Sequence, residues 1–301
     1  MTAGWLRGLV WIGGLSGATF AFALPPLVLG DTMLPALMTD ARLEELSGLA
    51  PHPRRDERLW ALNDGGAPAI LLEVDRRGRV QREVTVEGVQ NIDWEDLDHF
   101  RVDGRSRLLI ADTGDNARRR SEVYLHVVPV PPTGAVRVRP LWTLTLRYAD
   151  GPQDVEAVAV HPASDSILLV SKRVRPSVLY RVPLSAGGQS AIATAVRLRE
   201  LPELLDIPIP PGVDPGSNMV RFASQPTAMQ FGCDGALWVL SYAAVFRFEA
   251  ADWASAQGLS ARRAVLPPLP QAEALSFDRG CRHLYIGTET VPSPLLRYRQ
   301  R

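Results

Sequence analysis

The chain is poor in lysine and cysteine, and it has no excess of charge of either sign. Lys172 is the only lysine among 33 basic residues, and 33 Asp and Glu residues balance them. Balanced charge excludes the basic field that holds a nucleic-acid backbone, so we expect no nucleic-acid partner. The 301 residues are enough for one domain with a sizeable core.

A long apolar run occurs at the N-terminus. Arg7 precedes an apolar stretch from Leu9 to Leu29, and Ala21-Phe22-Ala23 has the small-x-small pattern of a cleavage site. Residues 1–30 are therefore predicted to be a secretory signal peptide. An uncleaved membrane anchor is the alternative, because roughly 20 apolar residues span a bilayer. Both readings make the remaining chain secreted, periplasmic or exposed at the cell surface.

The only two cysteines are Cys233 and Cys281. In an oxidising compartment a pair of cysteines is more often bridged than free. We therefore predict a disulfide between them, with no catalytic role.

Helical periodicity is also missing, and only Ala250 to Gly258 is predicted as a short helix. Instead, one unit recurs: two short apolar strands, the second ending in polar residues. The units begin at residues 47, 95, 156, 227 and 273, and each second strand ends 14 to 17 residues later. Such a repeat is typical of the blades of a β-propeller.

The predicted fold is thus an all-β propeller formed by residues 31–301 as a single domain, and we expect the protein to be a monomer. Five blades are expected, with six as the alternative if the Pro-rich insertion at about 201–225 hides another. The last unit is one strand short, and residues from Thr32 to Met38 are predicted to supply that strand and close the ring.

In a propeller, the start of each first strand and the end of each second strand lie at the same end of the central channel. The repeat therefore gathers polar side chains there. At the first position it aligns Ser47, Glu95, Glu156, Thr227 and Glu273. At the end of the second strand it aligns Asn63, Asp112, Ser171, Ser241 and Thr288, followed by Asp64, Lys172, Tyr242 and Glu289.

Carboxylates that converge on a narrow axis require a positive charge between them. One candidate is a divalent cation, with calcium favoured because it accepts oxygen ligands in a flexible shell. Its predicted ligands are Glu95, Glu156, Glu273 and Asp112. The other candidate is Lys172, whose compact ammonium could neutralise the ring from within. A channel filled with water and lacking any ligand is the third interpretation.

Recognisable catalytic motifs are absent from the sequence. It has no nucleophile elbow, no His-Glu-x-x-His and no phosphate-binding loop, and its five histidines are dispersed. If the protein is an enzyme, the candidate catalytic residues are Asp64, Asp115, Lys172 and Glu289, with a carboxylate as the base.

Several short motifs resemble a known group of proteins. They are Glu-Leu-Ser-Gly-Leu-Ala at 45–50, Asn-Asp-Gly-Gly at 63–66, Asp-Trp-Glu-Asp-Leu at 93–97 and Ala-Asp-Thr-Gly-Asp-Asn at 111–116. The chain is similar to secreted, largely uncharacterised bacterial propellers described as phytase-like, TolB-like or esterase-like. This resemblance implies the fold strongly and function weakly. It suggests calcium and a phosphorylated substrate, although the sequence lacks an evident basic phosphate pocket.

Three functions are compatible with these observations. The first is an extracytoplasmic propeller that binds a divalent cation and an unidentified ligand at the acidic mouth of its channel. The second is a calcium-dependent hydrolase of the phosphoesterase or lactonase type. The third is a protein-interaction platform that uses the 201–225 insertion, with an inert channel.

Overall fold

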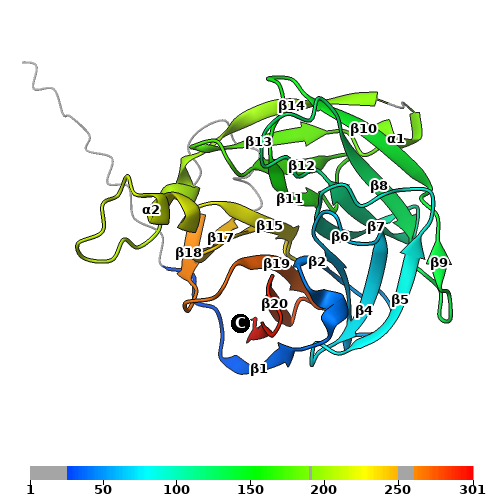
Figure 1. Cartoon of the computed structure of the whole chain (residues 1–301), viewed down its shortest axis with the longest axis horizontal. Helices are drawn as coiled ribbons and strands as arrows, with labels where there is room; N and C mark the ends of the chain where they lie inside the picture. Colours follow the sequence, from blue (N-terminus) through cyan, green and yellow to red (C-terminus); the bar gives the residue numbers. More distant parts are fainter. Residues whose placement is uncertain (1–25, 190–191, 250–260, 301) are drawn as a thin grey trace, which may run out of the picture.

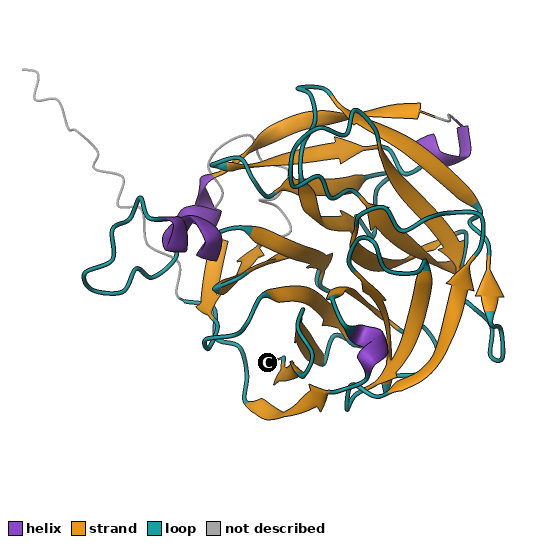
Figure 2. Cartoon of the chain, viewed as in Figure 1, coloured by secondary structure: helices purple, strands orange, loops and turns teal. Residues whose placement is uncertain are grey.

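The computed structural model describes residues 26–189, 192–249 and 261–300. Within these ranges almost all regular structure is β-strand, and the strands are arranged in sheets around one axis (Figures 1 and 2). The predicted all-β propeller is confirmed. Most of the predicted signal segment, and the helix predicted from Ala250 to Gly258, lie outside the described residues.

The first strand of each group lies next to the axis. These inner strands are β2 (Leu46–Pro51), β6 (Trp94–Val102), β11 (Val155–Val160), β15 (Pro226–Phe231) and β19 (Ala272–Phe277). Each contacts the next, and β19 contacts β2, so they form a closed ring (Figure 1). β2, β11 and β19 are buried along their whole length, which explains why most of their residues are apolar or small.

Each inner strand is followed by antiparallel strands at increasing distance from the axis. The second strands are β3 (Arg58–Asn63), β7 (Arg105–Asp112), β12 (Ile167–Ser171), β16 (Leu237–Ser241) and β20 (His283–Thr288). The third strands are β4 (Ile70–Asp75), β8 (Val123–Pro129), β13 (Ser177–Val182), β17 (Ala244–Phe248) and β21 (Ser293–Arg299). The outermost strands are β5 (Val80–Val86), β10 (Trp142–Tyr148), β14 (Ile192–Leu201), β18 (Ala261–Val265) and β1 (Thr32–Met38).

The N-terminal strand closes the molecule, as predicted. β1 pairs antiparallel with β21, so the last group takes its outer strand from the start of the chain. Leu27 is also buried, and its N–H donates to the carbonyl oxygen of Arg263 on β18 at 3.0 Å. The packed part of the chain therefore begins a few residues before the predicted boundary at residue 31.

Parallel pairings join neighbouring groups. β10 pairs with β14, which merges two groups into one eight-stranded sheet, and the short β9 (Arg137–Val138) pairs with β5. If this sheet is divided at the β10–β14 pairing, the described strands form antiparallel groups of four around the axis. The expected number of five blades stays a prediction.

Within the described ranges, helices are few and short. They are η1 (Ala41–Leu43), α1 (Ala186–Gln189), η2 (Pro202–Leu205) and α2 (Asn218–Ala223). The insertion predicted as a loop at 201–225 thus carries η2 and α2, and α2 was not predicted. It is six residues long and begins after Ser217, whose hydroxyl accepts from the N–H of Val220. Among the described residues, none of the helices has the length and apolar character needed to cross a membrane.

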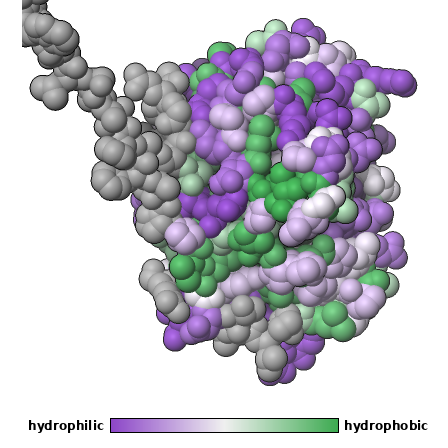
Figure 3. Space-filling model, turned by 90° about the vertical axis from the view of Figure 1, so that its left-hand side faces the viewer, coloured by the Kyte–Doolittle hydropathy of each residue, from purple (hydrophilic) through white to green (hydrophobic). Residues whose placement is uncertain are grey.

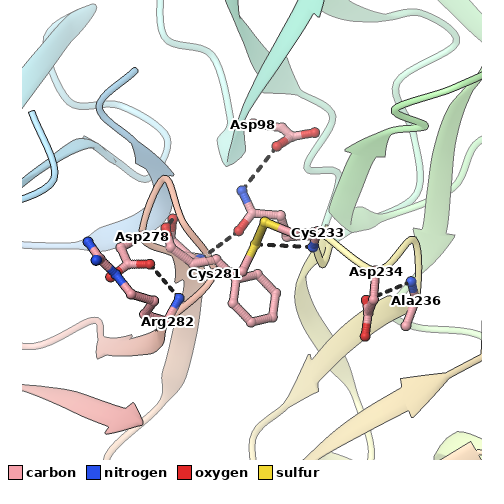
Figure 4. The surroundings of a disulfide bond; sticks show 10 residues. Asp98, Cys233, Asp234, Ala236, Asp278, Cys281 and Arg282 are labelled. Atoms are coloured by element: carbon pink, nitrogen blue, oxygen red, sulfur yellow. Dashed lines mark hydrogen bonds between the residues drawn. A yellow bond between two sulfur atoms is a disulfide. The ribbon is translucent and has the colours of Figure 1, made fainter. Parts of the chain in front are cut away.

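The predicted disulfide is confirmed. Cys233 and Cys281 lie in the turns that join β15 to β16 and β19 to β20, and the bridge connects these turns (Figure 4). These turns are at the opposite end of the inner strands from the aligned acids. Disulfides are typical of proteins that fold outside the reducing cytosol.

Candidate functional site

A β-bulge occurs at the start of every inner strand, and the predicted polar ring occupies these bulges. Pairing with the second strand skips one residue in each group, at Ser47, Glu95, Glu156, Thr227 and Glu273. A bulge leaves one residue out of the ladder and redirects its side chain. All five are buried, with at most 5% of their surface exposed. The same β-bulge in every repeat therefore places this ring at one end of the channel.

A repeated backbone hydrogen bond fixes the second polar position beside the ring. In three of the five groups, the residue that follows the second strand donates its N–H to a carbonyl oxygen. The acceptor is the residue two positions before the ring position. The pairs are Asp64 to Glu45, Lys172 to Asp154 and Glu289 to Gln271, at 2.8, 2.9 and 3.1 Å. These three side chains consequently lie at the mouth of the channel, as the repeat predicted.

Lys172 neutralises one half of the acidic end. Its ammonium donates to Glu156, lies 4.0 Å from Glu273 Oε1, and donates to the Tyr242 hydroxyl at 2.9 Å. Tyr242 in turn donates to Glu273 Oε1 at 2.6 Å. Burial alone would lower the pKa of Lys172, but the charges of Glu156, Glu273 and Glu95 outweigh it and raise that pKa. The predicted internal counter-ion is therefore present on this side of the channel.

The other half of the acidic end has no such cation. Asp64, Asp93 and Glu95 each offer a carboxylate oxygen, and these oxygens lie within 4.8 Å of one another. Among the described residues, the Asp64 carboxylate accepts one hydrogen bond, from the N–H of Gly65 at 2.5 Å. Within the described part of the chain, the Asp93 carboxylate has no hydrogen bond or ion pair. Three carboxylates thus meet without an ion pair to any cationic side chain that the structure describes.

Two glycines create the space around these carboxylates. A Cβ atom on Gly114 would lie 2.1 Å from Glu95 Oε1 and 2.6 Å from Asp93 Oδ2, and one on Gly65 would lie 2.3 Å from Asp93 Oδ1. Any larger residue at either position would displace the acids. The Asn-Asp-Gly-Gly and Asp-Thr-Gly-Asp-Asn motifs therefore form the walls of this cluster.

The pKa values of Asp64, Asp93 and Glu95 are all raised, chiefly because these carboxyl groups are buried. Burial raises the pKa of Asp64 to about 7, and the charges of Asp93, Glu273 and Glu289 add to the effect. Burial also raises the pKa of Asp93 to about 6, against the opposing influence of Arg120. The pKa of Glu95 lies well above its ordinary value, because of burial and then of the Glu156 charge. Ionisation of this cluster is costly without a cation.

A second group of acids shares Glu95 with the first but already has partners. Glu95, Asp154 and Glu156 also offer oxygens within 4.8 Å of one another. Asp154 accepts from the N–H of Asp115 and from Arg173 Nε, both at 2.8 Å, and Glu156 accepts from Lys172. Its charges are therefore compensated by protein cations, and the first cluster is the better candidate for a metal ion.

Two of the predicted site residues have other partners in the structure. Asp112, predicted as a metal ligand, accepts from Arg120 at 2.8 Å and from the N–H groups of Ile92 and Asp93 at 3.3 and 3.2 Å. Asp115, predicted as a possible base, accepts from the N–H of Arg120 at 2.7 Å. Both carboxylates hold the loops around the cluster, because these donors bind their oxygens. Neither belongs to a group of acids that could hold a metal ion among the residues that the structure describes.

Glu289 lies at the rim of the acidic end. It accepts from the side-chain amide of Gln271. Burial raises the pKa of Glu289 to about 7, and the charges of Glu273 and Glu45 contribute. A carboxyl group that titrates near neutral pH can exchange protons with a ligand, so Glu289 remains a candidate base.

Deeper in the channel, further acids have a structural role. Asp96 accepts from the N–H groups of Val158 and Met229 on two other inner strands, at 2.9 and 3.2 Å. Asp98 accepts from the N–H of Val160 at 2.8 Å and from Gln230 at 3.2 Å. These bonds satisfy the free inner edges of the strands and close the middle of the channel.

Known proteins resemble this chain in fold. No family model matches the sequence, and no curated protein matches it either. Among solved structures, the major Malassezia sympodialis allergen Mala s 1 is 11% identical and covers 88% of this chain and 96% of its own, with a TM-score of 0.56. A gluconolactonase from Xanthomonas campestris is 14% identical and covers 93% of this chain and 99% of its own, with a TM-score of 0.45. At these identities the similarity concerns the fold alone.

Proposed function

We propose that the protein binds a divalent cation, calcium in the first instance, through Asp64, Asp93 and Glu95 at the acidic end of its channel. The observation that carries this proposal is the meeting of three carboxylates within 4.8 Å without a protein cation between them. A bound ion would remove the cost of ionising these buried groups. Calcium would complete its shell with carbonyl oxygens and water.

The ligand types favour a hard cation. Both cysteines are consumed in the disulfide, and all three members of the cluster are carboxylates. Oxygen-only donor sets suit calcium, magnesium and manganese, whereas zinc and copper prefer nitrogen and sulfur. Calcium tolerates irregular geometry better than magnesium, which demands a near-ideal octahedron.

An ion at the mouth of the channel would leave coordination positions for a ligand, and we propose that ligand binding is the function of the site. Three observations support an extracytoplasmic location. They are the disulfide, the N-terminal apolar run and the resemblance to secreted bacterial propellers of the phytase-like group. The domain would act there as a monomer.

A second candidate function is calcium-dependent hydrolysis of an ester, lactone or phosphoester. Glu289 supports it, because its carboxylate lies at the rim of the acidic end, where it could act as a base that activates water near the ion. Asp64 is assigned to the metal in this scheme, so Glu289 is the expected base. The ion would polarise the oxygen of the bond to be cleaved.

The third candidate, an interaction platform with an inert channel, rests on exposed apolar side chains on and near the insertion. Met219 and Phe222 of α2 and Val265 of β18 are 62%, 45% and 53% exposed. Apolar surface is visible on this side of the molecule in Figure 3. An inert channel predicts that calcium has no effect on the protein.

The melting temperature in EDTA and in millimolar calcium tests the proposal, because a ligand that binds only the folded state raises it. We expect a calcium-dependent rise that is lost in Asp93→Asn and kept in Glu57→Gln, which removes one charge from an exposed site. The absence of any rise in the unmodified protein would refute the metal site. Ester, lactone and phosphoester substrates, assayed with Glu289→Gln as control, would then separate hydrolysis from binding alone.

A further inference from the structure

A pocket lined by cationic side chains adjoins the acidic end of the channel, because Lys172, which binds Glu156, is part of its lining. It has a volume of about 360 Å³ and lies between the turn from β12 to β13 and the insertion that carries α2. Its lining includes Lys172, Arg173, Arg175 and Arg221, and no carboxylate. In a chain with equal numbers of acidic and basic residues, this local segregation places a positive pocket beside the acidic end of the channel.

The four cations differ in whether they have a carboxylate partner among the described residues. Lys172 binds Glu156, and Arg173 binds Asp154. Arg175 and Arg221, by contrast, have no carboxylate partner among the residues that the structure describes. Arg175 Nη1 donates only to the hydroxyl of Ser224, at 3.4 Å.

The insertion is fixed over the site by an aromatic contact. Phe222 of α2 stacks on Tyr242, with ring centroids 4.0 Å apart and planes inclined by 6°. Tyr242 is the residue that binds both Lys172 and Glu273. Lys172 and Phe222 also line the positive pocket, so the two sites share a wall.

We infer that this pocket binds the anionic group of a small ligand, a carboxylate or a phosphate, through Arg175 and Arg221. Planar guanidinium groups suit both oxyanions, which they bind with paired hydrogen bonds. The volume is at the lower end of the range for small-molecule sites, which favours a compact ligand. The inference rests on the proposed function in one respect, because the rest of the ligand would extend towards the cation.

Calorimetric titration of the protein with inorganic phosphate in EDTA, and with acetate in calcium, tests the anion site. Phosphate is kept apart from calcium to avoid precipitation. The Arg175→Gln/Arg221→Gln double variant should bind the preferred anion at least about tenfold more weakly, as expected for the loss of charge-assisted hydrogen bonds. Arg181→Gln, an exposed arginine on β13, is the matched control and should bind normally.

The outcomes separate the anion site from the metal site. If the unmodified protein binds neither anion, or if the double variant binds as well as the control, the inference is wrong. Binding of phosphate alone identifies a phosphorylated ligand, and binding of acetate alone identifies a carboxylate. The calcium-dependent rise in melting temperature should persist in the double variant, and its absence from every form would overturn the metal site while leaving the anion result intact.

Discussion

Replacing Asp64 by Asn should stabilise the protein in the absence of calcium and remove its response to calcium. In the folded protein burial raises the pKa of Asp64 from 3.8 to about 7. A carboxyl group whose folded-state pKa is raised contributes stability below its unfolded pKa and loses that contribution as the pH rises through the folded value. The metal-free protein should therefore lose stability between about pH 4 and pH 7 because of this group.

The size of the effect follows from the shift in the pKa of Asp64. A difference of about three pKa units corresponds to roughly 4 kcal/mol at pH 8, since one unit is about 1.4 kcal/mol. Asn cannot ionise, yet its carbonyl oxygen can still accept from the N–H of Gly65. For a domain of this size, roughly 4 kcal/mol corresponds to a rise in melting temperature of roughly 8 °C.

The assay is thermal unfolding of the unmodified protein, Asp64→Asn and Glu57→Gln in EDTA at pH 5 and pH 8, repeated at pH 8 with calcium. The advantage of Asp64→Asn should be larger at pH 8 than at pH 5, and only the other two forms should gain from calcium. Equal destabilisation of Asp64→Asn at both pH values, with the calcium response retained, would refute the reasoning.

Three further variants test other parts of the site. Lys172→Met should lower the free energy of unfolding by about 3–5 kcal/mol, because Glu156 is left buried without a cation; an unchanged urea midpoint would contradict this. Joint replacement of Cys233 and Cys281 by Ser should cost about 2–5 kcal/mol in urea unfolding, yet leave the calcium response intact, since the bridge lies at the opposite end. Gly114→Ala should abolish the calcium response, because its Cβ would lie 2.1 Å from a ring carboxylate oxygen; a normal response would place the ion elsewhere.

The ring of polar residues could be predicted from the sequence because every blade repeats the same local structure. Spacing alone aligned Glu95, Glu156 and Glu273, and the bulges at the starts of the inner strands explain why one residue per unit breaks the apolar pattern. The closing strand was predictable for a similar reason, since the final unit ended one strand early.

Asp93 and Asp154 were missed as site residues, although the sequence contains a signal for them. Each lies two residues before a ring glutamate, so that Asp-x-Glu occurs at 93–95 and again at 154–156. Asp112 was assigned to the metal because it occupies an aligned position. Alignment fixes where a backbone lies, whereas the partner of a carboxylate depends on neighbouring loops, and here Arg120 reaches Asp112 from eight residues away.

The sequence left a cation and Lys172 as competing explanations for the acidic end, and the geometry divides the acids between them. Lys172 reaches Glu156 and Glu273 because it follows β12, while Asp64, Asp93 and Glu95 lie at the neighbouring blades. A single ammonium cannot compensate both halves. Ionising the buried carboxylates Asp64, Asp93 and Glu95 destabilises the folded protein unless a positive ligand binds between them. This is the physical reason to expect a cation there.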